Sequence, residues 1–455
     1  MNKKLLYLIL NSFYNTQENR IFALRADTLF SSNHNIVCIV MQLGYINFSQ
    51  EERNNLYKVI QSIREPHAID ELGIGRIRDA FSNKMFPGMS TLHNRAKYFV
   101  VLPCLYHQAE KGVYNSKNEV IQKVLDLEIK LTRQLVEWCK GVNASENYGI
   151  TGSTVIDAAE KNSSKYVKYD PSYIYWGGLV TYEFVKMDGN VYQLIFERSK
   201  HPEKHCKLMS DGCDGDSEDL SGRLQLFDTG GLNYKFDGKT PISIKLTRQE
   251  AELIKDRITR SEKSRNSLLS YLLTHPEIPT DKERFLDLGN EWNGLPDEYR
   301  RLYLLAARFS KFIYMLRIFY NYIYIKKTHQ DPDEGEKESQ EMLQRYKDFY
   351  AENKEELSKD KLEEVLEYVD NDVSDIYVKS FVRQAAEYVE NEQFDELEEC
   401  IIRREKDTKG AALAKLTNWK KYVGKEHVEA FELDYRWSRV SSMIKEIKEG
   451  LNNGE

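Results

Sequence analysis

Hydrophobic positions along the chain recur mostly at the spacing of an α-helix. The clearest case covers residues 120–140, where apolar side chains follow one another three or four positions apart and Gly141 stands where a helix would end. Asp170 and Pro171 form a typical helix start, because Asp caps the first turn and Pro fits the first helical position. From residue 297 onward almost every segment repeats the helical pattern. The sequence therefore predicts a mainly α fold.

One region breaks the helical pattern. Residues 181–187 and 191–197 are rich in side chains that favour strands, and they flank Asp188-Gly189-Asn190, a typical hairpin turn. Helices before this pair complete the element order of a winged helix, whose third helix enters a nucleic-acid groove. We therefore expect a small β-hairpin element and a winged-helix module in the middle of the chain, followed by a helical C-terminal part.

These patterns divide the 455 residues into five regions. Ser49 and Glu52 form a capping box that starts a helix, and residues 331–335 are the best linker candidate because they combine Pro, Gly and acidic residues. The expected regions are an N-terminal extension or mis-assigned start at 1–40, a helical N-terminal domain with a basic and aromatic cluster at 41–145, the winged-helix module plus an acidic loop at 146–245, a helical domain at 246–330, and an acidic helical region at 331–455.

The charge is unevenly distributed. The chain has a net charge of −7, yet residues 331–410 alone hold 26 acidic and 12 basic residues, which leaves the rest of the chain at +7. A polyanionic partner therefore meets attraction over most of the chain and repulsion at this acidic block. The block is a solvated helical face, a docking surface for a protein, or a mimic of a polyanion.

Cysteine usage and hydropathy indicate a cytoplasmic protein. The six cysteines are scattered and four lie in apolar or helical contexts, which is typical of core residues in a reducing compartment. The most apolar long stretch, residues 302–325, carries Arg308, Lys311 and Arg317. Three cations favour a buried or interfacial helix over a membrane span, so no membrane association is expected. The apolar run at residues 5–10 is shorter than a secretion signal requires.

Two groups of residues are candidates for nucleic-acid contact. Arginine and lysine bind phosphate, and interleaved aromatic rings stack on bases. The first group lies among phenylalanine and tyrosine residues, although Asp70, Glu71 and Asp79 are alternative partners for its arginines. The second would surround the groove of the winged helix. The candidates are Arg76, Arg78, Lys84, Arg95 and Lys97 in the first group, and Lys165, Lys168, Tyr173, Tyr175 and Lys186 in the second.

The sequence does not assign a catalytic, cofactor-binding or metal-binding residue. Gly73 and Gly75 lack the third glycine and the preceding strand of a dinucleotide loop. Glu128 and Lys130 after Asp126 match a carboxylate–lysine nuclease pattern, but they lie on an apolar-periodic helix instead of a strand. The cluster of His201, His205, Cys206 and Cys213 offers zinc-type ligands without a C-x2-C pair, so a loop with incidental ligands is favoured. No cofactor is expected.

Three stretches resemble an uncharacterised bacterial domain-of-unknown-function family. They are DELGIGRIRDAFS at 70–82 with FPGMST at 86–91 and RAKYF at 95–99, then DPSYIYWGGL at 170–179, and LDYRWSRV at 433–440. The resemblance implies cytosolic proteins encoded beside helicase and restriction-type genes in phage-defence neighbourhoods, and hence a DNA-associated role. Similar proteins begin near Met41, so a chain starting there is expected to fold.

The leading hypothesis from the sequence is a non-catalytic, nucleic-acid-associated accessory or adaptor protein of a bacterial defence system. Its expected partners are DNA and a helicase or restriction-type protein. Two alternatives stay open. One is a metal-dependent nuclease or hydrolase whose site is assembled from distant residues, and the other is a helical protein-interaction scaffold.

Overall fold

The structure is a computed structural model that describes residues 70–142, 149–187, 189–200, 226–289, 291–427 and 429–453. The chain divides into two units, residues 1–69 and 70–455, and all described residues belong to the second unit. The expected helix start at Ser49 and the expected chain start at Met41 therefore lie outside the described residues.

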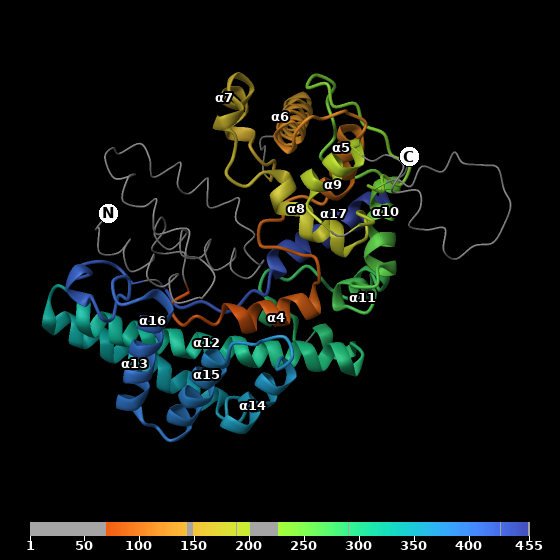
Figure 1. Cartoon of the computed structure of the whole chain (residues 1–455). Helices are drawn as coiled ribbons and strands as arrows, with labels where there is room; N and C mark the ends of the chain where they lie inside the picture. The colour runs from red at the N-terminus through yellow and green to blue at the C-terminus, as the bar shows by residue number, and fades with distance from the viewer. Residues whose placement is uncertain are drawn as a thin grey trace, which may run out of the picture. The chain divides into compact units, whose positions relative to one another are not determined.

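The described part of the chain is built from α-helices joined by loops and short 3₁₀ turns (Figure 1). The helices are α4 (Gly75–Met85), α5 (Tyr98–Glu110), α6 (Lys117–Gly141), α7 (Ile156–Lys161), α8 (Pro171–Thr181), α9 (Val191–Lys200), α10 (Arg248–Arg260), α11 (Leu268–Thr274), α12 (Asp297–Thr328), α13 (Pro332–Asn353), α14 (Lys359–Tyr368), α15 (Ile376–Glu390), α16 (Phe394–Lys409) and α17 (Trp437–Asn452). The mainly α prediction is confirmed.

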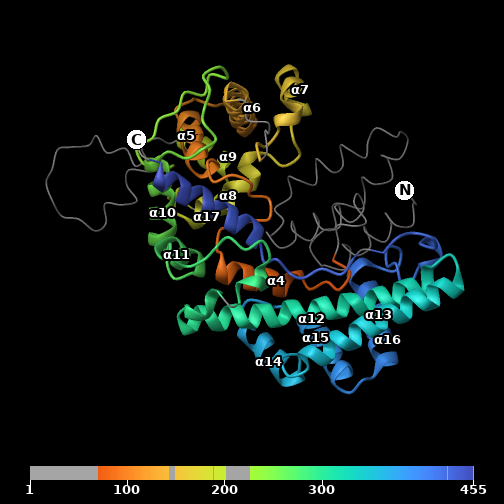
Figure 2. The ribbon, with the colours of Figure 1, turned by 180° about the vertical axis from the view of Figure 1, so that it is seen from behind.

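The long helix α12 organises one group of helices. α13 packs beside it, while α4 lies on one side of α12 and α14 and α15 lie on the other (Figures 1 and 2). Apolar side chains on several faces of α12 are buried, including Phe309, Phe312 and Leu316, because helices surround it. Two of its cations pair with acidic residues outside the helix, Arg308 with Glu364 and Lys311 with Glu356. The buried helix expected at residues 302–325 is therefore present.

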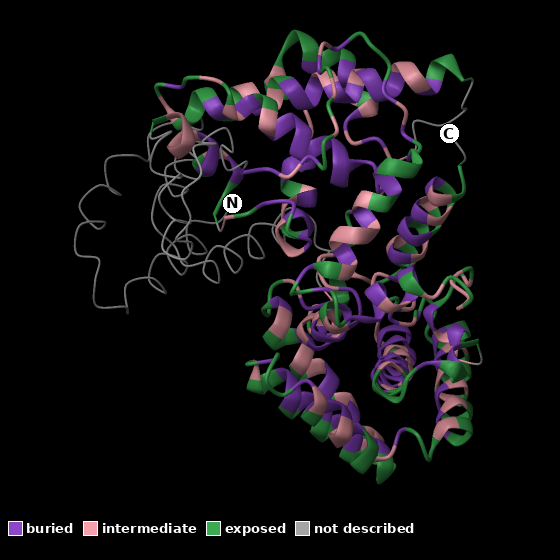
Figure 3. Cartoon of the chain, turned by 90° about the vertical axis from the view of Figure 1, so that its right-hand side faces the viewer, coloured by how far each residue is buried: buried purple, intermediate pink, exposed green. Residues whose placement is uncertain are grey.

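A second group of helices contains α5, α6, α8 and α9, and α10 packs against both α11 and α17. Buried residues gather where helices face one another, and exposed residues cover their outer sides (Figure 3). One hydrophobic core runs through both groups, from Leu72 to Ile447. The expected boundaries near residues 145, 245 and 330 stay predictions.

The helix start predicted at Asp170 is confirmed, and α6 also begins at a side-chain cap. Ser116 caps α6 by accepting the N–H of Glu119, and Asp170 caps α8 by accepting the N–H of Tyr173 at 2.7 Å. α4 ends directly before Phe86-Pro87-Gly88. Pro103 lies inside α5.

The predicted β-hairpin is wrong, and with it the winged-helix module. Residues 191–200 form helix α9, and in the described residues the only bridge of strand type joins Val185 to Phe227. Val191, Leu194 and Ile195 share the buried side of α9, so helical spacing outweighs the strand propensity of the individual residues. Asn190, expected in the turn, instead accepts the N–H of Tyr192 at 2.9 Å at the start of the helix.

Residues 331–335, the predicted linker, form the start of a helix, and the domain boundary near residue 330 stays a prediction. Asp331 accepts the N–H groups of Asp333 and Glu334, and Pro332 takes the first position of α13. Asp and Pro are common both in linkers between domains and at helix starts, and here they start a helix.

Among the described helices, none is both long and apolar enough to cross a lipid bilayer.

Candidate nucleic-acid interface

The first predicted group of cations is held by carboxylates of the same chain. Each of its five members lies within ion-pair distance of an acidic side chain. The pairs are Arg76 with Asp375 at 3.6 Å, Arg78 with Asp79 at 3.0 Å, Lys84 with Asp372 at 2.9 Å, Arg95 with Glu446 at 3.0 Å, and Lys97 with Glu250 at 2.6 Å. Most of these partners are far away in the sequence. The expected pairing with Asp79 is present, whereas Glu71 pairs with other lysines.

Lys97 lies in the interior. Its side chain and that of Glu250 are each only 3% exposed, and the ammonium lies 5.4 Å from the ring centroid of Tyr234. Burial lowers the pKa of Lys97, and the adjacent Glu250 carboxylate opposes that shift. Because Glu250 also completes the capping box of α10, the pair joins the start of α5 to the start of α10. Lys97 therefore has a structural role and no access to a nucleic acid.

Tyr175 also belongs to the core. Its ring stacks on His93 and Tyr98 with centroids 4.6 and 4.8 Å away. Its hydroxyl accepts the N–H groups of Asn94 and Arg95 and donates to the carbonyl of Arg95, each at 3.0 Å. Burial lowers the pKa of His93 to about 4, so the stacked imidazole is neutral at physiological pH. These contacts fix the turn before α5 and leave Tyr175 no face for a base.

Four predicted contact residues do reach the surface. Lys165, Lys168 and Lys186 are exposed, and Tyr173 is 59% exposed. The Lys168 ammonium lies 4.8 Å from the ring of Tyr169, which stacks on Tyr173 at 4.8 Å. The structure therefore brings Lys168 and Tyr173 together through Tyr169.

The nuclease-like residues on α6 point in different directions. Glu128 is fully buried, and its Oε1 accepts both the N–H and the hydroxyl of Ser172 at 2.7 Å. Asp126 and Lys130 instead form an exposed ion pair at 2.8 Å. Burial, and then the charge of Asp170, raise the pKa of Glu128 well above its ordinary value. The three side chains therefore do not form a shared metal site.

No group of three or more metal-binding side chains is found within the part of the chain that the structure describes. The zinc-type cluster at His201, His205, Cys206 and Cys213 lies outside it. The described cysteines Cys104, Cys139 and Cys400 are buried free thiols.

A basic loop that includes the last two residues of α16 is the strongest surface candidate. Residues 408–425 contain five lysines and no acidic residue. Trp419 is 37% exposed and Val423 is 44% exposed, and the exposed lysines Lys420, Lys421 and Lys425 surround them. None of these three lysines has an ion-pair partner among the described residues, in contrast to the first predicted group. Exposed cations beside an exposed indole are the elements of a single-strand binding surface.

The backbone of this loop is fixed from several sides. Asn418 donates its side-chain amide to the carbonyls of Ala411 and Ala414. Gly424 donates its N–H to the carbonyl of Thr328 at the end of α12. Its φ of +73° is easily adopted only by glycine. The exposed residues therefore stand on an ordered support, which reduces the entropy lost on binding.

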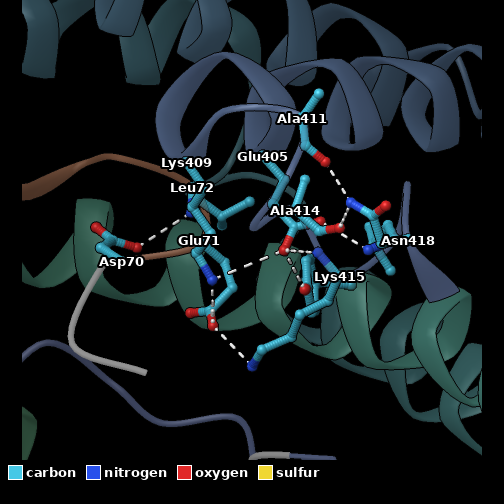
Figure 4. Close-up of polar contacts among 11 residues, drawn as sticks. Asp70, Glu71, Leu72, Glu405, Lys409, Ala411, Ala414, Lys415 and Asn418 are labelled. Carbon is cyan, nitrogen blue, oxygen red and sulfur yellow. Dashed lines mark hydrogen bonds and ion pairs between the residues drawn. The ribbon is translucent and has the colours of Figure 1, made fainter. Parts of the chain in front are cut away.

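A buried ionic cluster anchors the beginning of the loop (Figure 4). Glu405 is fully buried and accepts the N–H groups of Lys415 and Leu416 at 2.9 Å and the hydroxyl of Tyr320 at 2.8 Å. The ammonium groups of Lys409 and Lys415 both lie close to Oε1 of Glu71, at 3.0 and 3.1 Å. Two carboxylates and two ammonium groups balance in charge, as a buried cluster requires. The cluster joins the segment at Glu71, helix α16 and the basic loop.

The sequence reading missed this loop because charge was counted over long segments. When charges are summed separately before and after residue 410, Lys409 is counted with the acidic residues 331–410 and Lys415 with the nearly neutral segment that follows. A search for windows that lack acidic residues and contain tryptophan would have found it. The burial of Lys409 and Lys415 depends on Glu71, more than 300 residues away, and no local signal indicates that contact.

The three motif stretches that carry the family resemblance meet in the structure. Arg436 donates to the carbonyl of Met89 at 2.6 Å and to the side chain of Asn83 at 2.8 Å. A Cβ added to Gly178 would meet the carbonyl oxygen of Gly88 at 2.8 Å, so only glycine permits this close approach. Arg436 itself has a φ of +68°, a costly conformation that these contacts hold in place. The motifs therefore specify packing.

Comparison with known proteins supplies the family. No match was found among curated proteins, and none was found among solved structures. A model described as "Family of unknown function (DUF6361)" matches residues 40–379, which is most of the chain and includes two of the three motif stretches. The match begins one residue before Met41, and the basic loop lies beyond its end. The chain therefore belongs to the family of unknown function DUF6361.

Proposed function

We propose that this protein is a nucleic-acid-associated accessory protein that binds single-stranded segments through its basic loop, residues 408–425. The observation that supports this proposal best is the combination of exposed Trp419 with Lys420, Lys421 and Lys425, which have no ion-pair partner among the described residues, on a loop without acidic residues. The lysines supply the salt-dependent attraction to phosphates, and the indole supplies a stacking surface for a base.

The preference for single strands follows from the indole. A base within a duplex is already stacked on its neighbours, whereas a base in a single strand has an open face. We therefore expect stronger binding to single strands than to duplex of the same length. A second surface, Lys168 with Tyr169 and Tyr173, combines the same residue types and is proposed as an auxiliary contact.

The proposed role is non-catalytic. Among the described residues, the carboxylates that matched a nuclease pattern are separated, and Glu128 lies in the core. We further propose a cytoplasmic location, in agreement with three buried free thiols. An accessory role beside a helicase or restriction-type protein in phage defence rests on the family resemblance.

The test is fluorescence anisotropy with labelled single-stranded DNA, single-stranded RNA and duplex DNA over a series of salt concentrations. The variant Lys420→Gln/Lys421→Gln is expected to reduce the slope of log affinity for the single strand against log salt by about 1.4, because each phosphate contact removed contributes about 0.7. Lys239→Gln/Lys263→Gln, which changes two exposed lysines away from the loop, serves as the matched control. Salt-independent binding, or equal losses in both variants, would contradict the proposal.

One observation favours a second candidate function, a protein-interaction scaffold. Ile376 and Tyr377 are consecutive residues at the start of α15, and they are 68% and 75% exposed. Large apolar side chains that are exposed side by side are typical of contact sites for another protein. As the sole function, a scaffold predicts that no oligonucleotide binds at low salt.

A further inference from the structure

A groove between α12 and α14 carries a concentration of arginine that the basic loop does not involve. The groove has a volume of about 310 Å³ and is lined by Asp297, Arg300, Arg301, Leu304, Leu305, Arg308 and Glu364. Both helices belong to the group organised by α12 (Figure 1). It therefore combines a concave shape with positive charge and an apolar floor.

Two of its arginines are available to a ligand. Arg300 and Arg301 are exposed, and neither has a carboxylate partner among the described residues. The guanidinium of Arg301 lies 5.6 Å from the ring centroid of Tyr368, and the Lys84 ammonium lies 5.4 Å from the same ring. The ring of Tyr368 therefore lies between the guanidinium of Arg301 and Lys84, whose charge is balanced by Asp372.

The third arginine is part of the groove wall. Arg308 donates to Glu364 at 3.3 Å and to the carbonyl of Lys361 at 3.4 Å, which ties α12 to α14. Its Nε is buried and has no partner within the described part of the chain. Leu304 is 47% exposed between these charges and offers an apolar contact. The wall is therefore built before any ligand arrives.

The rim of the groove discriminates between anionic partners. Asp297 and Glu364 lie beside the arginines, so a continuous phosphate backbone would meet repulsion at both positions. A peptide can place its carboxylates at Arg300 and Arg301 and an apolar side chain on Leu304, and its backbone N–H groups can face the two acidic residues. We propose that this groove binds a short acidic and apolar peptide segment of a partner protein.

The proposal separates two surfaces of one adaptor, a loop for nucleic acid and a groove for protein. It does not depend on the loop binding nucleic acid, because the groove residues do not belong to the loop. Measuring peptide binding and oligonucleotide binding on the same variants therefore tests the groove and the loop separately.

The probe is a short fluorescein-labelled peptide of glutamate and leucine residues. The control peptide has glutamine in place of every glutamate. The full chain is expected to bind the acidic peptide, with affinity falling as salt rises, and to ignore the glutamine peptide. Arg300→Gln/Arg301→Gln should weaken binding roughly tenfold or more, because each charge-assisted hydrogen bond contributes substantially. Leu304→Ser should weaken it by a smaller factor.

The matched control is Arg248→Gln/Arg260→Gln, which removes two exposed arginines from α10. It should bind the acidic peptide like the unchanged chain, and thermal melting should show that all variants remain folded. Absence of peptide binding, or equal weakening in both double variants, overturns the proposal. A loss of oligonucleotide binding in Arg300→Gln/Arg301→Gln also overturns it, since that result assigns the groove to phosphate.

Discussion

Nζ of Lys409 lies 3.0 Å from Oε1 of Glu71, although the two residues are 338 positions apart in the chain. The same carboxylate oxygen also meets Nζ of Lys415 at 3.1 Å, so one glutamate holds two nearly buried ammonium groups. This relationship joins the first described residues to the loop that we propose as the nucleic-acid interface. The support of that loop is therefore a long-range electrostatic contact.

Removing the Glu71 carboxylate is expected to destabilise the protein by about 3 kcal/mol, since the buried ammonium group of Lys409 then keeps only Glu405, at 3.7 Å, and that of Lys415 loses the carboxylate with which it pairs. The variant is Glu71→Ala, and the measurement is the free energy of unfolding in urea. Glu387→Ala is the control, because its pair with Lys359 is exposed on both sides and contributes at most about 1 kcal/mol. Equal effects of the two substitutions would show that the cluster does not stabilise the fold.

The same cluster predicts a loss of stability in acid. Burial raises the pKa of Glu71, but the ammonium groups of Lys409 and Lys415 outweigh it and hold the pKa below the ordinary value of 4.5. A lowered pKa in the folded state contributes stability that is complete above that value and is lost as the pH falls further. The difference in unfolding free energy between the unchanged chain and Glu71→Gln should therefore shrink on acidification below about pH 4.5. A constant difference would contradict the assignment.

Glu128 predicts the opposite pH dependence. Burial and Asp170 raise its pKa well above the ordinary value, so its contribution to stability is complete at low pH and declines as the pH rises. Glu128→Gln keeps an oxygen acceptor for Ser172 and removes the titration. The unchanged chain should lose up to about 1.4 kcal/mol per pH unit relative to this variant as the pH rises above about 5. Glu137→Gln, on the exposed side of α6, should show no such trend.

Tyr175→Phe separates a structural role from a contact role. The substitution leaves the N–H groups of Asn94 and Arg95 without their acceptor and should cost about 1–3 kcal/mol of unfolding free energy. Oligonucleotide affinity should stay the same while the variant remains folded, because the ring is 1% exposed. A loss of oligonucleotide affinity without a loss of unfolding free energy would show that Tyr175 contacts the nucleic acid, as the sequence predicted.

Local signals in the sequence predicted most of the helices and little of the site. The amphipathic pattern identified α6 and the cap at Asp170 identified α8, because these signals lie within or next to the elements that they predict. The prediction of a hairpin was wrong because the buried face of α9 consists of residues that also favour strands. The prediction of the contact residues was wrong for a different reason. Whether Arg76 or Arg95 is free depends on Asp375 and Glu446, whose proximity only the tertiary structure establishes.

The most direct test of the account is the affinity of Trp419→Ala for a labelled single strand, measured by anisotropy beside Tyr377→Ala, which removes an exposed aromatic ring elsewhere. The account predicts that Trp419→Ala loses about 1–3 kcal/mol of binding free energy to the single strand and much less to duplex, because a stacking contact is removed. Tyr377→Ala should bind both oligonucleotides like the unchanged chain. Equal affinity of Trp419→Ala and the unchanged chain for the single strand would contradict the account.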